Sequence, residues 1–180
     1  LRRLESPLVA KLLSDADPKV VSEAAHAIYD DPAITAAYPA LADLIRINPG
    51  AMPPAIRRSI AANRYLADEK SAIRLSQFAA NEEAPQDLRI AALQALKSWT
   101  EESKLNPVDG RYDPLKPANE SIAKTAYIPV ATVLQHNADK DIATAAAAVS
   151  KNLGIVASVD DLVKEILDIK GDPTSRIAAL

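Results

Sequence analysis

The side chains best suited to catalysis or metal binding are few in this sequence. It has two histidines, His26 and His136, and no cysteine. Each histidine has one acidic residue at i,i+3 spacing, Glu23 for His26 and Asp139 for His136, whereas a zinc site needs further ligands at matched spacing. Without cysteine the chain forms no disulfide and no thiolate zinc site. We therefore expect structural or surface histidines, and we assign no metal ligand.

Acidic residues occur as adjacent pairs at four places. We expect these pairs at helix starts or ends, where carboxylates cap backbone N–H groups or favour the positive end of the helix dipole. They are Asp30-Asp31, Glu82-Glu83, Glu101-Glu102 and Asp160-Asp161. The sequence has no alternating oxygen ligands of a calcium loop, no glycine-rich phosphate loop and no Gly-x-Ser-x-Gly motif. We predict that this chain has no catalytic residue, binds no cofactor and is not an enzyme.

The densest basic cluster consists of Arg57, Arg58, Arg64 and Arg74. Such a cluster is typical of a surface that follows a nucleic-acid backbone. However, the formal net charge of the chain is -3, and the only aromatic residue near the cluster is Tyr65. The same arginines suit a solvated helix face or a ladder between neighbouring helices. We favour these two interpretations and expect no nucleic acid as a partner.

The elements that position these residues are predicted to be helices. The clearest is 85–99, which begins with a proline and carries apolar residues at helical spacing up to Trp99. Alanine is abundant, and all four glycines fall between helical segments. Prolines at 39 and 129 lie inside predicted helices, and Pro39 is expected to kink or restart its helix. Helices are predicted over 8–13, 18–29, 33–47, 54–66, 70–80, 85–99, 120–135, 139–153 and 159–169, with another starting at 175.

These helices pair into hairpins that repeat along the chain. The first inward residues of the second helices recur at a period of roughly 35 residues once the long loop is discounted, as in helical repeat proteins. They are Val20, Ile56, Leu88, Ile142 and Ser175. A hairpin of this size cannot bury both helix faces alone, so neighbouring hairpins are expected to stack on a shared core. We expect Trp99 to be the largest buried side chain of that core.

The segment 103–119 interrupts the pattern between the third and fourth hairpins. It has no helical period, it contains Pro107, Pro114 and Pro117, and its Asp109-Gly110 step is a strong turn signal. We expect a long ordered loop, which is uncommon in compact folds. Two interpretations are open and can coexist. In the first, Tyr112 and Leu115 fold back over Trp99. In the second, Asp109, Arg111 and Tyr112 contact a neighbouring domain or another protein.

The sequence resembles the short HEAT repeat, of the type also found in phycobilisome lyases. The resemblance is carried by SPLVAKLLSDADPKVVSEAAHAI, PQDLRIAALQAL and DPTSRIAAL, and it extends over nearly the whole chain. It implies a right-handed superhelix, and a ladder between a turn aspartate and an arginine that opens the second helix. Arg57 or Arg58, Arg89 and Arg176 occupy the arginine place, whereas Val21 and Ala143 occupy it in the first and fourth repeats. A nucleic-acid enzyme of the HEAT type, similar to DNA glycosylases, is the alternative that this resemblance implies.

A narrower resemblance lies at the loop. Trp99 followed by NPVDGRYDPLKP looks like the insertion in the HEAT region of large secreted bacterial proteins that join a sugar-dehydrogenase-like propeller to a c-type haem domain. This implies a periplasmic or cell-surface parent in which the segment spaces or docks other modules. The chain itself has no Cys-x-x-Cys-His motif, so no redox activity carries over. Because it starts at Leu1 and stops inside a predicted helix, we expect a segment of a longer polypeptide.

Together these observations predict an all-α fold, a right-handed α-solenoid of about five helical hairpins with one long proline-rich loop, as a single domain over 1–180. The expected function is a non-catalytic protein-interaction or spacer module. Its partners are neighbouring domains or another protein, which we expect it to contact through Asp109, Arg111, Tyr112, Arg57 and Arg58. No apolar run approaches the length of roughly 20 residues that spans a bilayer, so no membrane insertion is expected.

Overall fold

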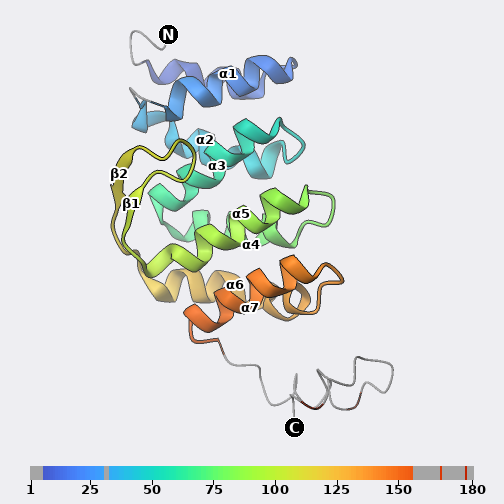
Figure 1. Ribbon diagram of the computed structural model, residues 1–180. Helices are drawn as coiled ribbons and strands as arrows, with labels where there is room; N and C mark the ends of the chain where they lie inside the picture. The colour runs from blue at the N-terminus through green and yellow to red at the C-terminus, as the bar shows by residue number, and fades with distance from the viewer. Residues whose placement is uncertain (1–5, 31–32, 156–166, 168–176, 178–180) are drawn as a thin grey trace.

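The computed structural model describes residues 6–30 and 33–155, together with the single residues 167 and 177. This part of the chain is mostly helical, as predicted (Figure 1). It contains an eight-residue 3-10 helix, seven α-helices and two single-turn 3-10 helices. They are η2 (Pro7–Ser14), α1 (Pro18–Tyr29), η3 (Thr35–Ala37), α2 (Tyr38–Ile47), α3 (Pro53–Leu66), α4 (Glu69–Ala80), α5 (Gln86–Lys97), η4 (Ser98–Thr100), α6 (Glu120–Gln135) and α7 (Lys140–Asn152). The predicted fifth hairpin, 159–180, lies outside the described residues.

Capping residues and prolines set where the helices begin. Asp17 accepts a hydrogen bond from the Lys19 amide at the start of α1, and Asp68 accepts one from the Ser71 amide at the start of α4. Pro39 lies in the first turn of α2, where its missing N–H costs no helical hydrogen bond, so the helix restarts there after η3. Pro129 lies inside α6, which continues through it.

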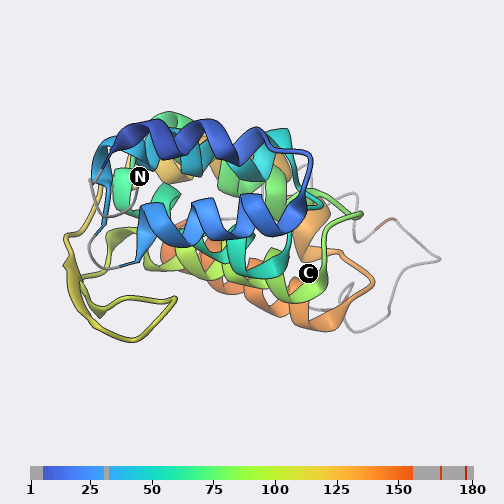
Figure 2. The same ribbon diagram turned by 90° about the horizontal axis from the view of Figure 1, so that it is seen from above.

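The helices pack as hairpins in two rows. Within each hairpin, η2 packs on α1, α2 on α3, α4 on α5 and α6 on α7. Between hairpins, α1, α3, α5 and α7 contact one another in succession and form one row, while η2, α2, α4 and α6 form the other (Figures 1 and 2). The hand and curvature of a superhelix stay a prediction.

The core between the rows consists of alanine, branched aliphatic side chains and a few aromatics. Small residues such as Ala25, Ala42 and Ala62 are fully buried, and they let neighbouring helices approach closely. Trp99 has no exposed surface and is the largest fully buried side chain among the described residues, as predicted. Complete burial of a tryptophan makes this position sensitive to truncation.

The segment 103–119 contains two short strands, whereas the sequence predicts a long ordered loop without secondary structure. Strand β1 (Ser103–Leu105) pairs antiparallel with β2 (Tyr112–Leu115), with Leu105 opposite Tyr112. We call this pair the β-hairpin. Its turn is closed by hydrogen bonds from the Gly110 amide to the Asn106 carbonyl and from the Asn106 amide to the Arg111 carbonyl. Gly110 has a φ of 72°, which suits glycine in this predicted Asp-Gly turn. The strands themselves are too short to show a two-residue hydrophobic period, so sequence pattern does not predict them.

Candidate functional site

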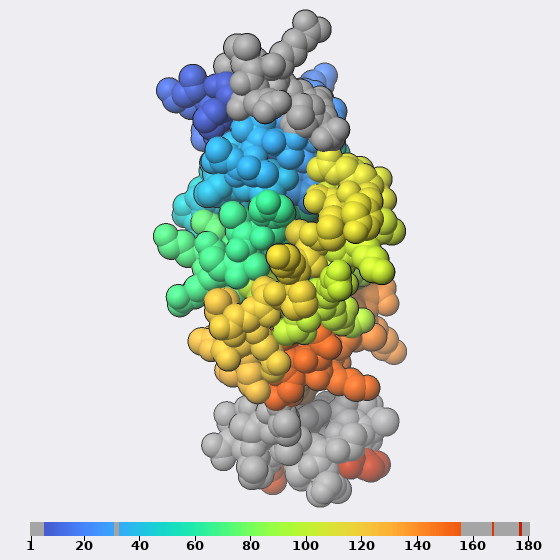
Figure 3. Space-filling model, turned by 90° about the vertical axis from the view of Figure 1, so that its left-hand side faces the viewer, coloured from blue at the N-terminus to red at the C-terminus, as the bar shows by residue number. Residues whose placement is uncertain are grey.

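The β-hairpin leaves the helical rows after η4 and lies against elements that come much earlier in the chain. Its anchor is Asn106, which is 3% exposed and whose Nδ2 donates to Tyr29 Oη and Asp113 Oδ2, both at 3.0 Å. Arg111 Nη2 also donates to the Tyr29 carbonyl at 3.1 Å. In Figure 3 the β-hairpin, in yellow, lies along the side of the blue and green helices. These hydrogen bonds connect the segment that follows the third helical hairpin to the end of α1.

A row of tyrosines lies next to this anchor. The rings of Tyr29 and Tyr38 stack with centroids 5.5 Å apart, and Tyr65 meets Tyr38 edge to face at 4.8 Å. Tyr29 and Tyr38 are both 2% exposed. Burial raises the pKa of Tyr38 to about 12 and raises the pKa of Tyr29 further. Both phenols are therefore neutral at ordinary pH and serve as packing and hydrogen-bonding groups.

The predicted partner residues Asp109 and Arg111 contact each other and the body of the protein. Asp109 accepts a hydrogen bond from the Arg111 amide at 3.1 Å, and its carboxylate lies 3.6 Å from Arg111 Nε. Arg111 Nη2 lies 3.8 Å from the Asp113 carboxylate. These contacts organise the β-hairpin tip internally. A role in binding a partner stays a prediction for both residues.

Tyr112 does not cover Trp99, and this part of the sequence prediction is wrong. Tyr112 is 75% exposed, because alternation along β2 turns it outward while Leu115 is buried. Trp99 is held by other groups. Its indole N–H donates to the Asn119 carbonyl at 3.0 Å, and its backbone carbonyl accepts from the Ala118 amide at 2.9 Å.

Three of the clustered arginines form ion pairs between elements, and two of these pairs are mostly buried. Arg58 on α3 donates two hydrogen bonds, of 2.8 and 2.7 Å, to the Asp30 carboxylate at the end of α1. Burial acts to raise the pKa of Asp30, but the Arg58 hydrogen bonds and charge together hold that pKa below its usual value. Arg74 on α4 lies 3.0 Å from Asp43 on α2. These arginines therefore connect neighbouring helical hairpins, as the ladder interpretation predicted.

The other ladder candidates behave differently. Arg57 pairs with Asp87 across α3 and α5 at 2.6 Å, but both side chains are about half exposed. Arg89 is 6% exposed and donates from Nε to the Ala79 carbonyl at 2.8 Å, without an ion pair among the described residues. Because the arginines use carboxylates in some layers and carbonyls in others, they do not form one uniform ladder. Arg176 lies outside the described residues.

Arg64 is the most deeply buried arginine of the cluster. It is 3% exposed, and its Nε and Nη2 donate to the carbonyl oxygens of Ser98, Glu101 and Lys116 at 3.0 to 3.3 Å. Its guanidinium carbon lies 5.8 Å from the centroid of the Trp99 ring, a cation–π distance. Burial lowers the pKa of Arg64 from its ordinary value. The residue closes the base of the β-hairpin onto α3 and η4.

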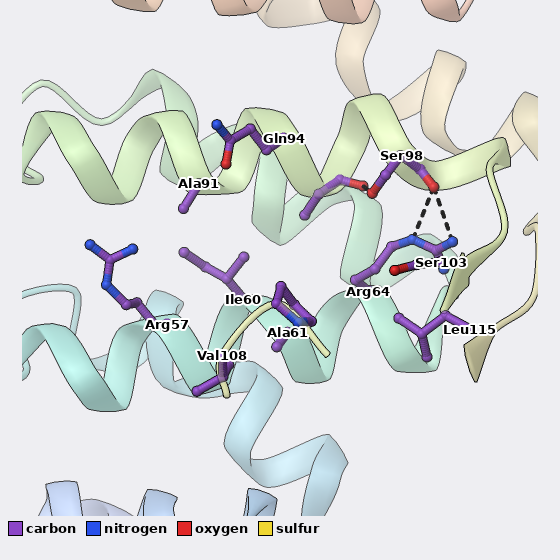
Figure 4. A pocket seen from close by; sticks show the side chains of 12 residues that line it. Arg57, Ile60, Ala61, Arg64, Ala91, Gln94, Ser98, Ser103, Val108 and Leu115 are labelled. Atoms are coloured by element: carbon purple, nitrogen blue, oxygen red, sulfur yellow. Dashed lines mark hydrogen bonds between the residues drawn. The ribbon is translucent and has the colours of Figure 1, made fainter. Parts of the chain in front are cut away.

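A pocket of about 280 Å³ lies between α3, α5 and the β-hairpin (Figure 4). We call it the α3–α5 pocket. Its walls are mostly apolar, with Arg57 towards one end and Arg64, Ser98 and Ser103 at the other. It is lined by Arg57, Ile60, Ala61 and Arg64 from α3, by Ala91, Gln94, Ala95 and Ser98 from α5 and η4, and by Ser103, Pro107, Val108 and Leu115 from the β-hairpin segment.

Sequence reasoning selected Arg57 but missed most of this pocket. Two spacings in the sequence could have indicated it. Arg57 and Arg64 are seven residues apart, about two turns, and so lie on one face of their helix. Ala91 and Ala95 have i,i+4 spacing and share one face of the next helix but one. The third wall comes from the segment 103–119, for which the sequence predicts no regular secondary structure. Its placement depends on the anchor at Tyr29.

The two histidines lie on separate elements, as expected. His26 Nε2 on α1 is 2.9 Å from the Asp30 carboxylate, and Nδ1 is 3.6 Å from Glu23. His136 follows α6 and places Nδ1 2.8 Å from the Thr132 carbonyl. Within the described residues, no group of three histidine, aspartate or glutamate side chains comes together as a metal site.

None of the helices in the described ranges combines the length and the apolar character needed to cross a membrane. Comparison with protein-family models, with curated proteins and with solved structures finds no match.

Proposed function

We propose that this chain is a HEAT-like α-solenoid that catalyses no reaction and serves as a protein-interaction or spacer module in a larger extracytoplasmic protein. The successive contacts within each of the two helix rows support the solenoid, because repeat units of this type contact mainly their neighbours. The resemblance of the loop residues to the HEAT region of secreted dehydrogenase-like proteins supports the location and the parent.

One observation supports the binding role most directly. Tyr112 and Leu105 are opposite each other on the β-hairpin, and they are 75% and 57% exposed. The β-hairpin that carries them is tied to the helices by the buried Asn106 and by Arg111. A large exposed tyrosine is typical of the anchors of protein interfaces, and a preordered support means that little further entropy is lost on binding.

The alternative of a nucleic-acid enzyme receives less support. Arg58 is neutralised by Asp30. Arg74 shares the Asp43 carboxylate with Arg46. Arg64 is directed to backbone carbonyls inside the protein. Of the four clustered arginines, Arg57 has the most exposed ion pair, and that pair includes Asp87. These positions do not produce the stripe of uncompensated cations on which phosphate binding depends.

Site-specific photocrosslinking tests the interaction role. A photoreactive phenylalanine analogue replaces Tyr112 in the full reading frame that contains this chain. We expect crosslinks from position 112 to a neighbouring domain. Ile128 on α6, which is 52% exposed, is the matched control and should give none. Equal crosslinking from both positions, or none from position 112, would contradict the proposed contact.

The parent protein and the absence of catalysis have separate tests. The reading frame around this chain should encode a propeller before it and a Cys-x-x-Cys-His haem domain after it. Turnover of any substrate by the isolated chain would refute the non-catalytic role. Retention of DNA by the isolated chain in a low-salt gel shift would favour the nucleic-acid alternative.

A further inference from the structure

We propose that the α3–α5 pocket binds a small aliphatic carboxylate, with its apolar body between α3, α5 and the β-hairpin and its carboxylate at Arg64. This site goes beyond the interaction module, because it lies under the β-hairpin, whereas the exposed pair of Leu105 and Tyr112 lies on it. Three properties of the pocket support this ligand: the apolar walls, the unbalanced charge at one end and the size.

The apolar walls come from three elements. Ile60 and Ala61 on α3 face Ala91 on α5, and Leu115 of β2 contributes to the third side (Figure 4). Ala95 of α5 also lines the pocket. Small alanine side chains on both helices leave the space between them open. Hydrophobic walls with a few placed polar groups are typical of small-molecule sites, so an aliphatic body fits here.

The charge of Arg64 is not balanced by an ion pair within the described residues, and the charge of Glu101 acts on it only from beyond ion-pair distance. The partners of Arg64 in the described part of the chain are three carbonyl oxygens and the Trp99 ring. Those hydrogen bonds use Nε and Nη2, which leaves Nη1 without a hydrogen-bond acceptor among the described residues. A buried cation is normally paired with an anion, and a ligand carboxylate would supply one.

The groups around the pocket also indicate a single negative charge and its orientation. The hydroxyls of Ser98 and Ser103 already donate to the carbonyls of Ala95 and Leu105, so they have no hydrogen left for an anion. Arg57, at the other end, is bound to Asp87 at 2.6 Å. One unbalanced arginine therefore favours a monocarboxylate over a dianion, with its head at Arg64 and its tail towards Arg57.

The volume limits the size of the ligand. An engineered apolar cavity of about 150 Å³ binds benzene, which has six non-hydrogen atoms, so a pocket of about 280 Å³ has room for about eleven. Hexanoate, with eight, is therefore a suitable probe. Trp99 is the only tryptophan of the chain, and its ring lies beneath Arg64, so its fluorescence reports on an anion arriving there.

The experiment is a titration of the whole chain with hexanoate, followed by Trp99 fluorescence and by amide shifts in NMR. We expect saturable binding with a Kd of about 1 mM or lower, a value reasonable for a ligand of this size. The amides of Ala61 and Ala95 should shift. Hexanol, which has the chain without the charge, and acetate, which has the charge without the chain, should each bind at least tenfold more weakly.

Two variants test the location without relying on a single substitution. Ala95→Leu fills the pocket and should reduce hexanoate affinity at least tenfold, whereas Ala147→Leu, the same change at an exposed position of α7, should not. Arg64→Lys keeps a positive charge but loses the fork of donors, and it should weaken hexanoate binding more than hexanol binding. The proposal is overturned if no saturable change appears, if hexanol binds as well as hexanoate, or if Ala95→Leu binds hexanoate normally.

Discussion

Arg58 and Arg64 lie on the same helix, are both largely buried and bind other elements, yet they stabilise the protein differently. Arg58 forms two hydrogen bonds to the Asp30 carboxylate, so its charge is neutralised inside a link between α3 and α1. Arg64 binds three carbonyl oxygens and lies over Trp99, so it connects the β-hairpin base to α3 without an ion pair in the described structure. The comparison shows that residue type and helix position do not determine an arginine's role. That role depends on which acceptor the tertiary structure places next to the guanidinium group.

The largest effect is expected from removing the ring beneath Arg64. Trp99→Ala leaves a cavity in a fully buried site and removes the hydrogen bond to the Asn119 carbonyl. We expect the free energy of unfolding to fall by about 3 to 5 kcal/mol, as for other buried aromatic truncations. Urea unfolding followed by circular dichroism measures it, and an unchanged midpoint would refute the placement of Trp99 in the core.

Arg64→Met comes next. The methionine fills part of the space but leaves the carbonyls of Ser98, Glu101 and Lys116 without their donor. We expect a loss of about 2 to 3 kcal/mol in the free energy of unfolding, since unsatisfied buried polar groups are costly. The β-hairpin amides should also exchange faster with solvent. Protection of those amides at the level of the unchanged protein would contradict the fastening role of Arg64.

Arg58→Met should lower the free energy of unfolding by less than Arg64→Met does. After Arg58→Met, the Asp30 carboxylate keeps His26 Nε2 as a partner at 2.9 Å. We therefore expect a loss of about 1 to 2 kcal/mol, between the values for exposed and fully buried ion pairs. Parallel urea titrations of the two variants check the order. A larger loss at Arg58 than at Arg64 would reverse the comparison.

The two arginine sites should also differ in acid. In the folded state the pKa of Asp30 is below its ordinary value of about 3.9. The ion pair therefore stabilises the protein fully at any pH above about 3.9. This stabilisation is lost as the pH falls through the folded pKa. Asp30→Asn should thus reduce the fall in melting temperature between about pH 5 and pH 2, the window of such losses. Arg64→Met should leave that fall unchanged, because Arg64 has no titratable partner within hydrogen-bond distance in the described structure. If the melting temperatures of the unchanged protein, Asp30→Asn and Arg64→Met all fall by the same amount, the role of Asp30 in the acid loss is contradicted.

The smallest effect on stability is expected at Tyr112. Because this side chain is 75% exposed, Tyr112→Ser should change the free energy of unfolding by less than about 0.5 kcal/mol. The same variant should lose the contact with a neighbouring domain. A clear loss of stability would show that the ring packs on the body of the protein, as the sequence first suggested.

The sequence alone determined most of the helical fold. Proline and aspartate at helix starts, glycine at breaks and apolar residues at helical spacing predict α1 and α3 to α7 to within a few residues, because these signals are local hydrogen-bonding and burial preferences. Complete burial of Trp99 follows from the same pattern.

The position and the walls of the candidate site depend on contacts between residues that are far apart in the sequence. Asn106 meets Tyr29 across 77 residues, and Arg64 meets the Lys116 carbonyl across 52, and no local preference specifies such pairings. These distant contacts hold the β-hairpin against the helices, where its residues form the third wall of the α3–α5 pocket. Local chemistry predicts where a helix begins, but the partner of a buried charge depends on which distant carbonyl or carboxylate packing brings within reach.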